Sequence, residues 1–316
     1  YLLVNQWGDV PLLLEEITEP KLDFYTVSRM KILQQMKTDM EFAVKWLPKN
    51  VKPGCVNRAA GEHLLAKIYL STGDFQLAVD ATTRCINDYG LHLMKERFGV
   101  NAEDASLDVF NDLFQEDNIS SSENKEAIFV VQERYGIEGN VAPNGSARMR
   151  NFVPYWCNGA AVKTPDGKPG TTYDAGPYDG YEWVEKLGRG IAKIRPTNYS
   201  QYAIWGKCGN DLRHNENNWF DISRLKYNRP ASKGGSATYF GTPVQRSFVT
   251  DTMRCYFSFP TVKTLIYKND INKGKTPTGG FTDHYVFRLA ETYLMRAEAY
   301  YWMGNAVGAK NDVNEI

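Results

Sequence analysis

The chain has 316 residues, of which 42% are hydrophobic, enough for a substantial core in one large domain or two average ones. Lys plus Arg and Asp plus Glu each number 37, so the formal net charge is zero, and no Lys/Arg-rich run suggests a surface for nucleic-acid phosphates. No window of about 18 apolar residues predicts a transmembrane helix, and no signal peptide is visible. Because the chain opens on Tyr1 and ends within a helical pattern, we expect a segment of a longer protein.

Four segments carry apolar residues at three- and four-residue steps, which predicts amphipathic helices. These segments are 24–47, 60–71, 75–89 and 285–303, and each is followed by a typical terminator: Pro48, Gly73, Gly90 and Gly304. The face of the last helix predicted to point inward consists of Ala290, Tyr293, Leu294, Ala297, Tyr300 and Tyr301.

Two of these segments share one spacing of small, aromatic and glycine residues. The first copy is Ala66, Tyr69, Gly73 and Ala78, and the second, at the same offsets, is Ala297, Tyr300, Gly304 and Ala309. Small residues let two antiparallel helices approach closely, the tyrosine packs across them, and the glycine makes the turn. This spacing matches the tetratricopeptide helix–turn–helix repeat. The helix at 24–47 is interpreted as the second helix of a preceding repeat.

The composition changes between the two copies. Residues 131–280 hold 18 of the 26 glycines and 10 of the 14 prolines, which predicts turns, short strands and loops, and 127–132 is predicted as a buried strand. Dense aromatic residues indicate an ordered region. We therefore expect a mainly α fold, a tetratricopeptide-like α/α superhelix with a long loop-rich insertion containing short strands. The expected parts are a scaffold at 1–92, the insertion at 93–283 and a returning repeat at 284–316, within one structural domain.

The insertion carries four of the seven tryptophans, on segments rich in Asn, Asp and Arg. Loops held by a rigid scaffold are common binding sites. Aromatic faces stack on the apolar C–H groups of a sugar ring while amides and charged groups hydrogen-bond its hydroxyls. Peptide binding fits equally, and the alternative for any one tryptophan is a place in a small core. The candidate ligand-binding residues are Trp156, Trp183, Tyr181, Trp205, Arg195 and Asn198.

Signals for catalysis or metal binding are weak. The insertion's carboxylates are Glu133, Asp166, Asp174, Asp179, Glu182, Glu185, Asp211 and Glu216. Glycoside hydrolysis would need two of them about 5–10 Å apart, and the sequence does not give that separation. The four histidines and five cysteines are scattered without a zinc-binding spacing. We therefore predict no catalytic residue, no metal site and no cofactor, and keep a glycoside hydrolase only as a remote alternative.

Several stretches, in this order, resemble one family, the SusD/RagB nutrient-binding outer-membrane lipoproteins of Bacteroidetes-type bacteria. They are "YLLVNQWGDVPLLLEE" (1–16), "AVKWLP" (43–48), "RAAGEHLLAKIYLSTGDFQLAVDATTRCIN" (58–87), "NKEAIFVVQ" (124–132), "NDLR" (210–213) and "DHYVFRLAETYLMRAEAY" (283–300). In "NDLR", Leu212 stands where the family pattern has proline. The family's ligand residues follow no fixed motif, so none is transferred to this chain by position.

The resemblance implies about four tetratricopeptide-like units, with much of the ligand site on the loop-rich insertion. It also implies display on the outer membrane through an N-terminal lipidated cysteine that this chain lacks, a SusC-like TonB-dependent transporter as partner, and no catalysis. The function expected is capture of an oligosaccharide and delivery to that transporter. The alternatives are a peptide-binding member and a protein–protein scaffold without a small ligand. Gly8–Pro11 is expected to form a turn, and Arg288, Glu291 and Glu298 ion pairs between repeats.

Overall fold

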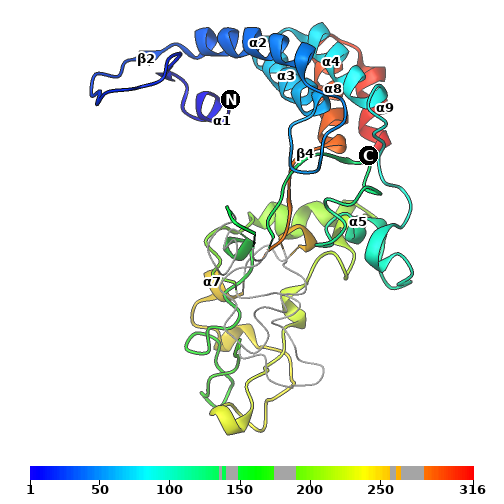
Figure 1. The fold of residues 1–316 in the computed structure, drawn as a ribbon. Coiled ribbons are helices and arrows are strands. Elements are labelled where there is room, and N and C mark those ends of the chain that lie inside the picture. Colours follow the sequence, from blue (N-terminus) through cyan, green and yellow to red (C-terminus); the bar gives the residue numbers. More distant parts are fainter. Residues whose placement is uncertain (135–136, 140–148, 174–189, 257–260, 265–280) are drawn as a thin grey trace. The chain divides into compact units, whose positions relative to one another are not determined.

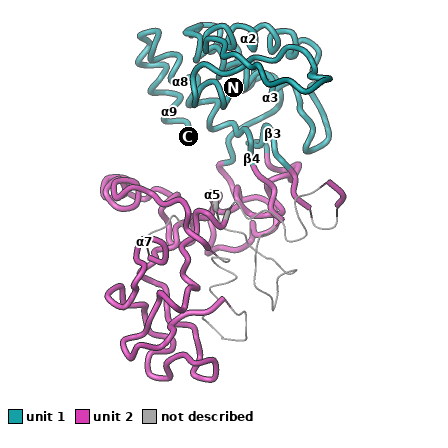
Figure 2. Tube along the Cα trace, turned by 90° about the vertical axis from the view of Figure 1, so that its left-hand side faces the viewer, with its two compact units in different colours: residues 1–94, 125–131, 285–316 teal, residues 95–124, 132–284 magenta. Residues whose placement is uncertain are grey.

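The computed structural model describes residues 1–134, 137–139, 149–173, 190–256, 261–264 and 281–316. The chain divides into two compact units, coloured separately in Figure 2. The helical unit comprises residues 1–94, 125–131 and 285–316, and the loop-rich unit comprises 95–124 and 132–284. The insertion expected at 93–283 is therefore interrupted, because residues 125–131 belong to the helical unit.

Five helices build most of the helical unit (Figure 1). They are α2 (Arg29–Trp46), α3 (Arg58–Thr72), α4 (Phe75–Asn87), α8 (Leu289–Trp302) and α9 (Ala306–Glu315). Each packs against the next in this order, so α8 follows α4 in space although the loop-rich unit separates them in sequence. The predicted mainly helical fold is confirmed. No helix in the described part of the chain is long and apolar enough to cross a bilayer.

The shared repeat residues do what their spacing predicts. Ala66 and Ala78 are both 0% exposed where α3 meets α4. Gly73 and Gly304 adopt positive φ, 82° and 78°, a conformation that suits glycine and ends the first helix of each pair. One buried cluster joins both repeats: Leu65, Ala66, Tyr69, Ala78, Val79, Ala81, Met295 and Ala299. The two repeats therefore share this hydrophobic cluster.

The predicted helix at 24–47 begins later than expected, at Arg29. Residues Thr26–Val27 form a short strand, β2, which pairs antiparallel with β1 (Val10–Pro11). The Asp9 carboxylate accepts the backbone N–H of Arg29 at 2.8 Å and so caps the helix from a distant part of the chain. The turn predicted at Gly8–Pro11 is only partly right: Gly8 ends α1 (Leu2–Trp7) with φ 77°, but Val10–Pro11 is strand β1.

The predicted helix at 285–303 was also wrong in its first turn. Strand β4 (His284–Arg288) occupies that position and pairs with β3 (Ala127–Val131), which lies close to the predicted strand at 127–132. Helix α8 starts only at Leu289, whose N–H donates to the Glu126 carbonyl at 2.9 Å. Pairing with a strand far away in the sequence thus overrides the local helical preference.

The inward face predicted for the last helix is only partly right. Leu294 and Tyr301 are 49% and 67% exposed, whereas Thr292, Met295 and Ala299 are buried. The face of α8 that packs against α4 therefore includes Met295 together with small residues such as Ala299, and leaves out Leu294 and Tyr301.

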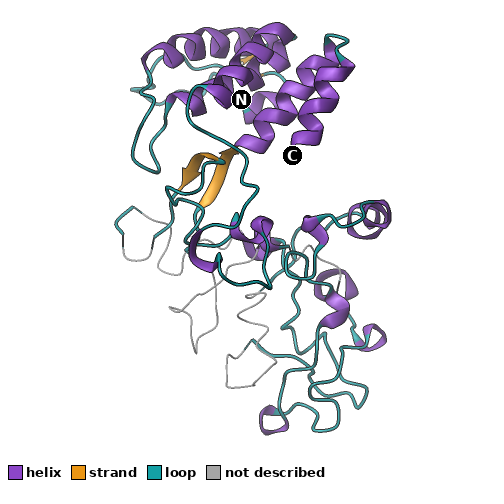
Figure 3. Cartoon of the chain, turned by 90° about the vertical axis from the view of Figure 1, so that its right-hand side faces the viewer, coloured by secondary structure: helices purple, strands orange, loops and turns teal. Residues whose placement is uncertain are grey.

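The loop-rich unit contains few regular elements (Figure 3). Its described helices are short, among them α5 (Val109–Asp112) and α7 (Thr252–Cys255). A separate core holds it together, formed by Val153, Trp156, Cys157, Ala161, Val162, Ile222, Leu225, Tyr227, Val244, Val249 and Cys255. The buried Tyr227 hydroxyl donates to the Lys163 carbonyl at 2.9 Å, so this polar group is satisfied inside the core.

Candidate functional site

An aromatic pocket of about 170 Å³ lies in the loop-rich unit. Its lining consists of Gln201, Tyr202, Trp205, His214, Trp219, Phe220, Asp221 and Ile222. Trp205 stacks on His214 with ring centres 4.5 Å apart and an interplanar angle of 17°. Trp219 meets Trp205 edge-on at 5.4 Å. The three rings form one wall with defined geometry; Trp219 is buried and Trp205 is half-buried.

An irregular helical segment positions Trp205. Residues Tyr199–Ala203 form a π-helical turn that continues as a 3₁₀ turn over Ile204–Lys207. The Trp205 indole N–H donates to the Ser200 carbonyl at 3.0 Å, which fixes the ring against its own backbone. Such π-turns are rare and are frequently found at functional sites. The ring is therefore held in place before any ligand arrives, which lowers the ordering cost of binding.

Polar groups face the same pocket. The Gln201 amide donates to the Tyr202 hydroxyl at 3.0 Å. Partial burial raises the pKa of Tyr202, so its hydroxyl is neutral at pH 7. One oxygen of Asp221 accepts the N–H of Ser223 at 2.9 Å, which fixes the carboxylate at the pocket lining. The pocket thus combines aromatic faces with a hydroxyl, an amide and a carboxylate, a set that suits a ring-shaped polyhydroxylated ligand.

The pocket wall is anchored by three asparagines within the four residues that precede Trp219. We call Asn215, Asn217 and Asn218 the asparagine clamp. The Asn218 amide, 1% exposed, donates to both carboxylate oxygens of Asp108 at 2.8 Å. The Asn215 amide donates to the same carboxylate at 3.2 Å, and the Asn217 amide donates to the Ser106 carbonyl at 2.5 Å. These amides are engaged with the protein, so they position Trp219 and are not ligand groups.

The structure separates the sequence candidates. Trp205 lines the pocket, whereas Trp156 is 0% exposed in the core of the loop-rich unit, so its proposed place on a ligand surface is wrong. Arg195 and Asn198 are exposed on the segment that leads into the π-turn and are not among the lining residues. Trp183 and Tyr181 lie outside the described residues.

Trp205 is the one lining residue among the sequence candidates. The other seven, Gln201, Tyr202, His214, Trp219, Phe220, Asp221 and Ile222, were missed. Tyr202 had a local signal, because it precedes Trp205 by three residues and falls on the same side of a helical turn. His214 and Asp221 had none, since a fold without regular elements brings them to Trp205.

The carboxylates considered for hydrolysis have other partners where the structure describes them. Hydrogen bonds from Arg213 lower the pKa of Asp211, and hydrogen bonds led by the Thr164 hydroxyl lower that of Asp166. Glu133 is buried 3.3 Å from His284. Within the described ranges, no group of three or more His, Cys, Asp or Glu side chains is arranged to hold a metal ion. Asp174, Asp179, Glu182 and Glu185 lie outside those ranges.

Three solved structures with the same fold come from bacteria of the genus Bacteroides. A SusD superfamily protein from Bacteroides vulgatus aligns over 99% of this chain and 54% of its own, with a TM-score of 0.60 and 21% identity. Surface glycan-binding protein A from Bacteroides uniformis aligns over 99% of this chain and 55% of its own, with a TM-score of 0.60 and 15% identity. The protein of that name from Bacteroides thetaiotaomicron was solved in complex with laminarihexaose. It aligns over 94% of this chain and 55% of its own, with a TM-score of 0.57 and 17% identity.

This chain therefore spans about half the length of these structures. The sequence matches none of the curated proteins. The family model of the SusD family matches residues 125–316, which is well over half of the chain and includes the pocket, strands β3 and β4 and the returning repeat. The chain belongs to the SusD family.

Proposed function

We propose that this chain carries the ligand-capture site of a cell-surface glycan-binding protein, and that the aromatic pocket around Trp205 is part of that site. The observation that carries the proposal is the wall of Trp205, His214 and Trp219, held rigid by the Ser200 carbonyl and by the asparagine clamp. Rigid aromatic faces gain affinity from apolar C–H contact without a large ordering cost.

The size of the pocket favours one ring of a longer ligand. Its volume of about 170 Å³ is smaller than the roughly 300 Å³ at which pockets for drug-sized molecules begin. An oligosaccharide would place one sugar ring against Trp205 and extend along neighbouring surface. A related fold is known in complex with laminarihexaose, which supports an oligosaccharide as the ligand class.

Delivery of the captured glycan to a SusC-like TonB-dependent transporter is part of the same proposal, as is a lipid anchor on the outer membrane. Both rest on membership of the SusD family. The proposal assigns no catalytic step and no cofactor, because binding and transfer to a transporter require neither. Co-purification of the full-length protein with a SusC-like transporter from the same organism would test this part.

The pocket is tested by calorimetry with Trp205→Ala. We expect the wild-type protein to bind at least one neutral oligosaccharide from a panel that includes laminarihexaose and a xyloglucan oligosaccharide. Loss of the stacking face should weaken binding roughly tenfold or more, since aromatic contacts contribute on the order of 1 kcal/mol beyond their buried area. Trp46→Ala is the matched control, because Trp46 is 74% exposed on α2 of the helical unit.

Two results would contradict the proposal. The first is equal affinity of the wild-type and Trp205→Ala proteins for the oligosaccharide that binds. The second is binding of peptides in the same panel with no oligosaccharide bound, which would favour the peptide-binding alternative.

A further inference from the structure

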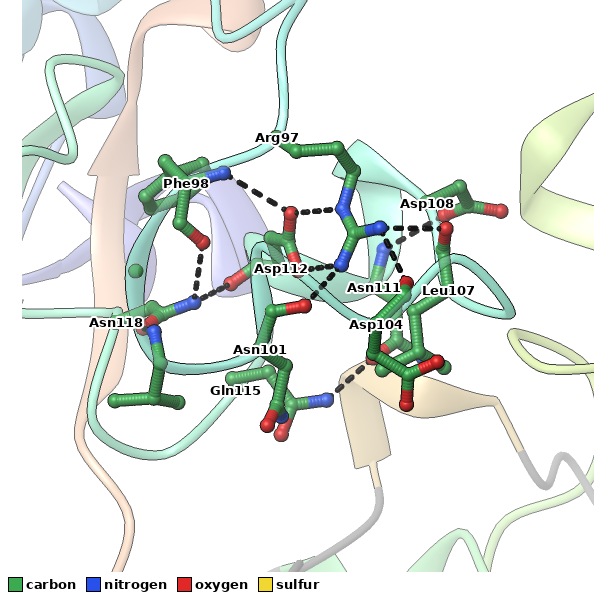
Figure 4. Close-up of polar contacts among 12 residues, drawn as sticks. Arg97, Phe98, Asn101, Asp104, Leu107, Asp108, Asn111, Asp112, Gln115 and Asn118 are labelled. Carbon is green, nitrogen blue, oxygen red and sulfur yellow. Dashed lines mark hydrogen bonds and ion pairs between the residues drawn. The ribbon is translucent and has the colours of Figure 1, made fainter.

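Arg97 lies at the centre of an irregular acidic loop in the loop-rich unit, and its guanidinium is fully engaged there (Figure 4). Its Nε donates to Asp112 at 2.6 Å, and one terminal nitrogen reaches the other oxygen of the same carboxylate at 3.1 Å. The terminal nitrogens also donate to three backbone carbonyls, those of Asn101, Asp104 and Leu107. One cation thus gathers five oxygen contacts.

This arrangement is what a bound metal ion often provides in an acidic loop. Backbone carbonyls and carboxylates converge on a positive charge, and the loop takes its shape from that centre. In this chain a guanidinium supplies the charge, and its planar set of five N–H donors fixes directions that a spherical ion would not. Asp112 is 0% exposed, so removal of the guanidinium would leave a buried carboxylate without its charge partner.

The same loop is closed on its other side by a tight contact. Asn118 donates to the carbonyls of Phe98 and Asp112 at 3.2 and 3.0 Å and accepts the Val100 N–H at 3.0 Å. Gly99 has φ 74°, and a Cβ at this position would collide with the Asn118 side chain. The loop from Gly99 to Asp112 is therefore held in one conformation from both sides.

The same loop also holds the asparagine clamp, which anchors the pocket wall. Asp108, which receives the amides of Asn215 and Asn218, lies between Leu107 and the helix that carries Asp112. Asn111 adds a donor to the Asn218 side-chain oxygen at 3.0 Å. The carbonyl of Ser106 receives the third amide of the asparagine clamp. The hydrogen bonds between the asparagine clamp and Ser106, Asp108 and Asn111 therefore all involve the segment that Arg97 holds in shape.

We propose that Arg97 is a positioning residue for ligand binding: it acts as a built-in cation that shapes the acidic loop, and through Asp108 and the asparagine clamp it sets the place of Trp219 in the pocket wall. Its role in binding rests on the proposed function, but its effect on the pocket wall does not. Arg97 lies outside the pocket lining and acts only through other residues.

Hydrogen exchange measured by mass spectrometry tests the positioning without a ligand. In Arg97→Ala, we expect the backbone amides of residues 212–219 to exchange about tenfold faster or more, together with those of 99–112. Guanidinium chloride at millimolar concentration, far below the denaturing range, should restore slow exchange in both segments, while equal NaCl should not. Arg97→Lys keeps the charge but loses the planar donors, and should give an intermediate rate.

Arg213→Ala is the matched control, because Arg213 pairs with Asp211 in the same unit but is 59% exposed. It should leave exchange in 99–112 unchanged. The proposal is overturned if Arg97→Ala speeds exchange only in 99–112, or if NaCl restores slow exchange as well as guanidinium does.

A binding measurement with laminarihexaose distinguishes failure of this inference from failure of the proposed function. If the wild type binds laminarihexaose, Arg97→Ala should weaken it roughly tenfold, with recovery in guanidinium chloride. If the wild type binds no oligosaccharide, the proposed function fails, and the exchange experiment still decides whether Arg97 positions the pocket wall.

Discussion

His63 is a buried polar side chain whose partners all come from the returning repeat. Its Nδ1 lies 2.9 Å from the Thr292 hydroxyl and its Nε2 lies 3.0 Å from a carboxylate oxygen of Glu291, while its ring stacks on Phe287 at 4.4 Å. Lys67 donates to the second oxygen of Glu291 at 2.5 Å. A neutral imidazole fits this site, donating to the carboxylate from Nε2 and accepting from the hydroxyl at Nδ1.

These contacts predict how stability depends on pH. Burial lowers the pKa of His63 below 6.5 and outweighs the raising effect of Glu291. Burial raises the pKa of Glu291, but hydrogen bonds from His63 and Lys67 outweigh it and bring the pKa to about 2. The unfolded chain therefore binds more protons in acid than the folded chain does. Stability should fall as pH drops below 6.5 through His63, and below about 4.5 through Glu291.

The measurement is the free energy of unfolding in urea at pH 7.5, 6.5, 5.5 and 5.0 for the wild type and for His63→Gln. One histidine contributes at most about 1.4 kcal/mol per pH unit. The wild type should lose stability more steeply than the variant over this range, and parallel curves would show that His63 does not couple folding to protonation. His92→Gln serves as a control at a histidine outside this cluster.

Ion pairs predicted at the residue level had mixed outcomes. Glu291 pairs with Lys67 on α3, an ion pair between repeats as predicted. Arg288 instead lies 3.3 Å from the buried Glu126, which directly precedes strand β3 and belongs to neither repeat. Glu298, by contrast, is exposed on α8. The rotation of α8 about its axis decides this difference, and that rotation depends on packing against α4, which the amphipathic pattern of α8 alone does not specify.

At the scale of elements, the two repeat copies have the same spacing but different burial. Ala78 is 0% exposed between helices, whereas its counterpart Ala309 is only half-buried on α9. Replacing Ala78 with leucine would force extra carbon atoms into an interface that is already filled. Ala78→Leu should therefore cost about 1–3 kcal/mol of unfolding free energy.

Ala309→Leu is the matched substitution in the second copy, and it should cost less than about 0.5 kcal/mol because part of the side chain can reach solvent. Urea denaturation of both variants at pH 7 gives the comparison. Equal costs at the two positions would mean that repeat spacing, not burial, sets the sensitivity.

Sequence periodicity predicted the elements well where they are stabilised by near neighbours. Helices α3 and α4, which are adjacent in sequence and pack against each other, begin and end within about two residues of their predicted limits. It was wrong at Tyr285–Arg288, where pairing with β3 decides the conformation. For the site, composition selected Trp205, but it selected Trp156 equally, because tryptophans on a core and on a pocket wall have the same local surroundings in sequence.

At the scale of the whole molecule, the helical unit is built from three separate stretches of sequence. Leu289 belongs to a buried cluster with Ala59, Ala60, Cys85, Ile86 and Ile128, so all three stretches meet in one core. The returning repeat continues the row of helices that the first stretch begins, since α8 packs on α4 and α9 packs on α8.

A chain ending at Asp283 tests whether the returning repeat completes the core. It lacks β4, α8 and α9, so the faces of α3 and α4 that contact Met295 and Ala299 become exposed, and β3 loses its partner. Loss of several kcal/mol of burial should lower Tm by about 10 °C or more and broaden the transition. The same chain should bind a dye that reports exposed apolar surface.

A chain ending at Val313 is the control, because residues 314–316 are exposed and Asp312, the partner of Arg296 at 2.7 Å, is retained. A sharp transition at the wild-type Tm for the chain ending at Asp283 would show that α3 and α4 form a complete core without α8.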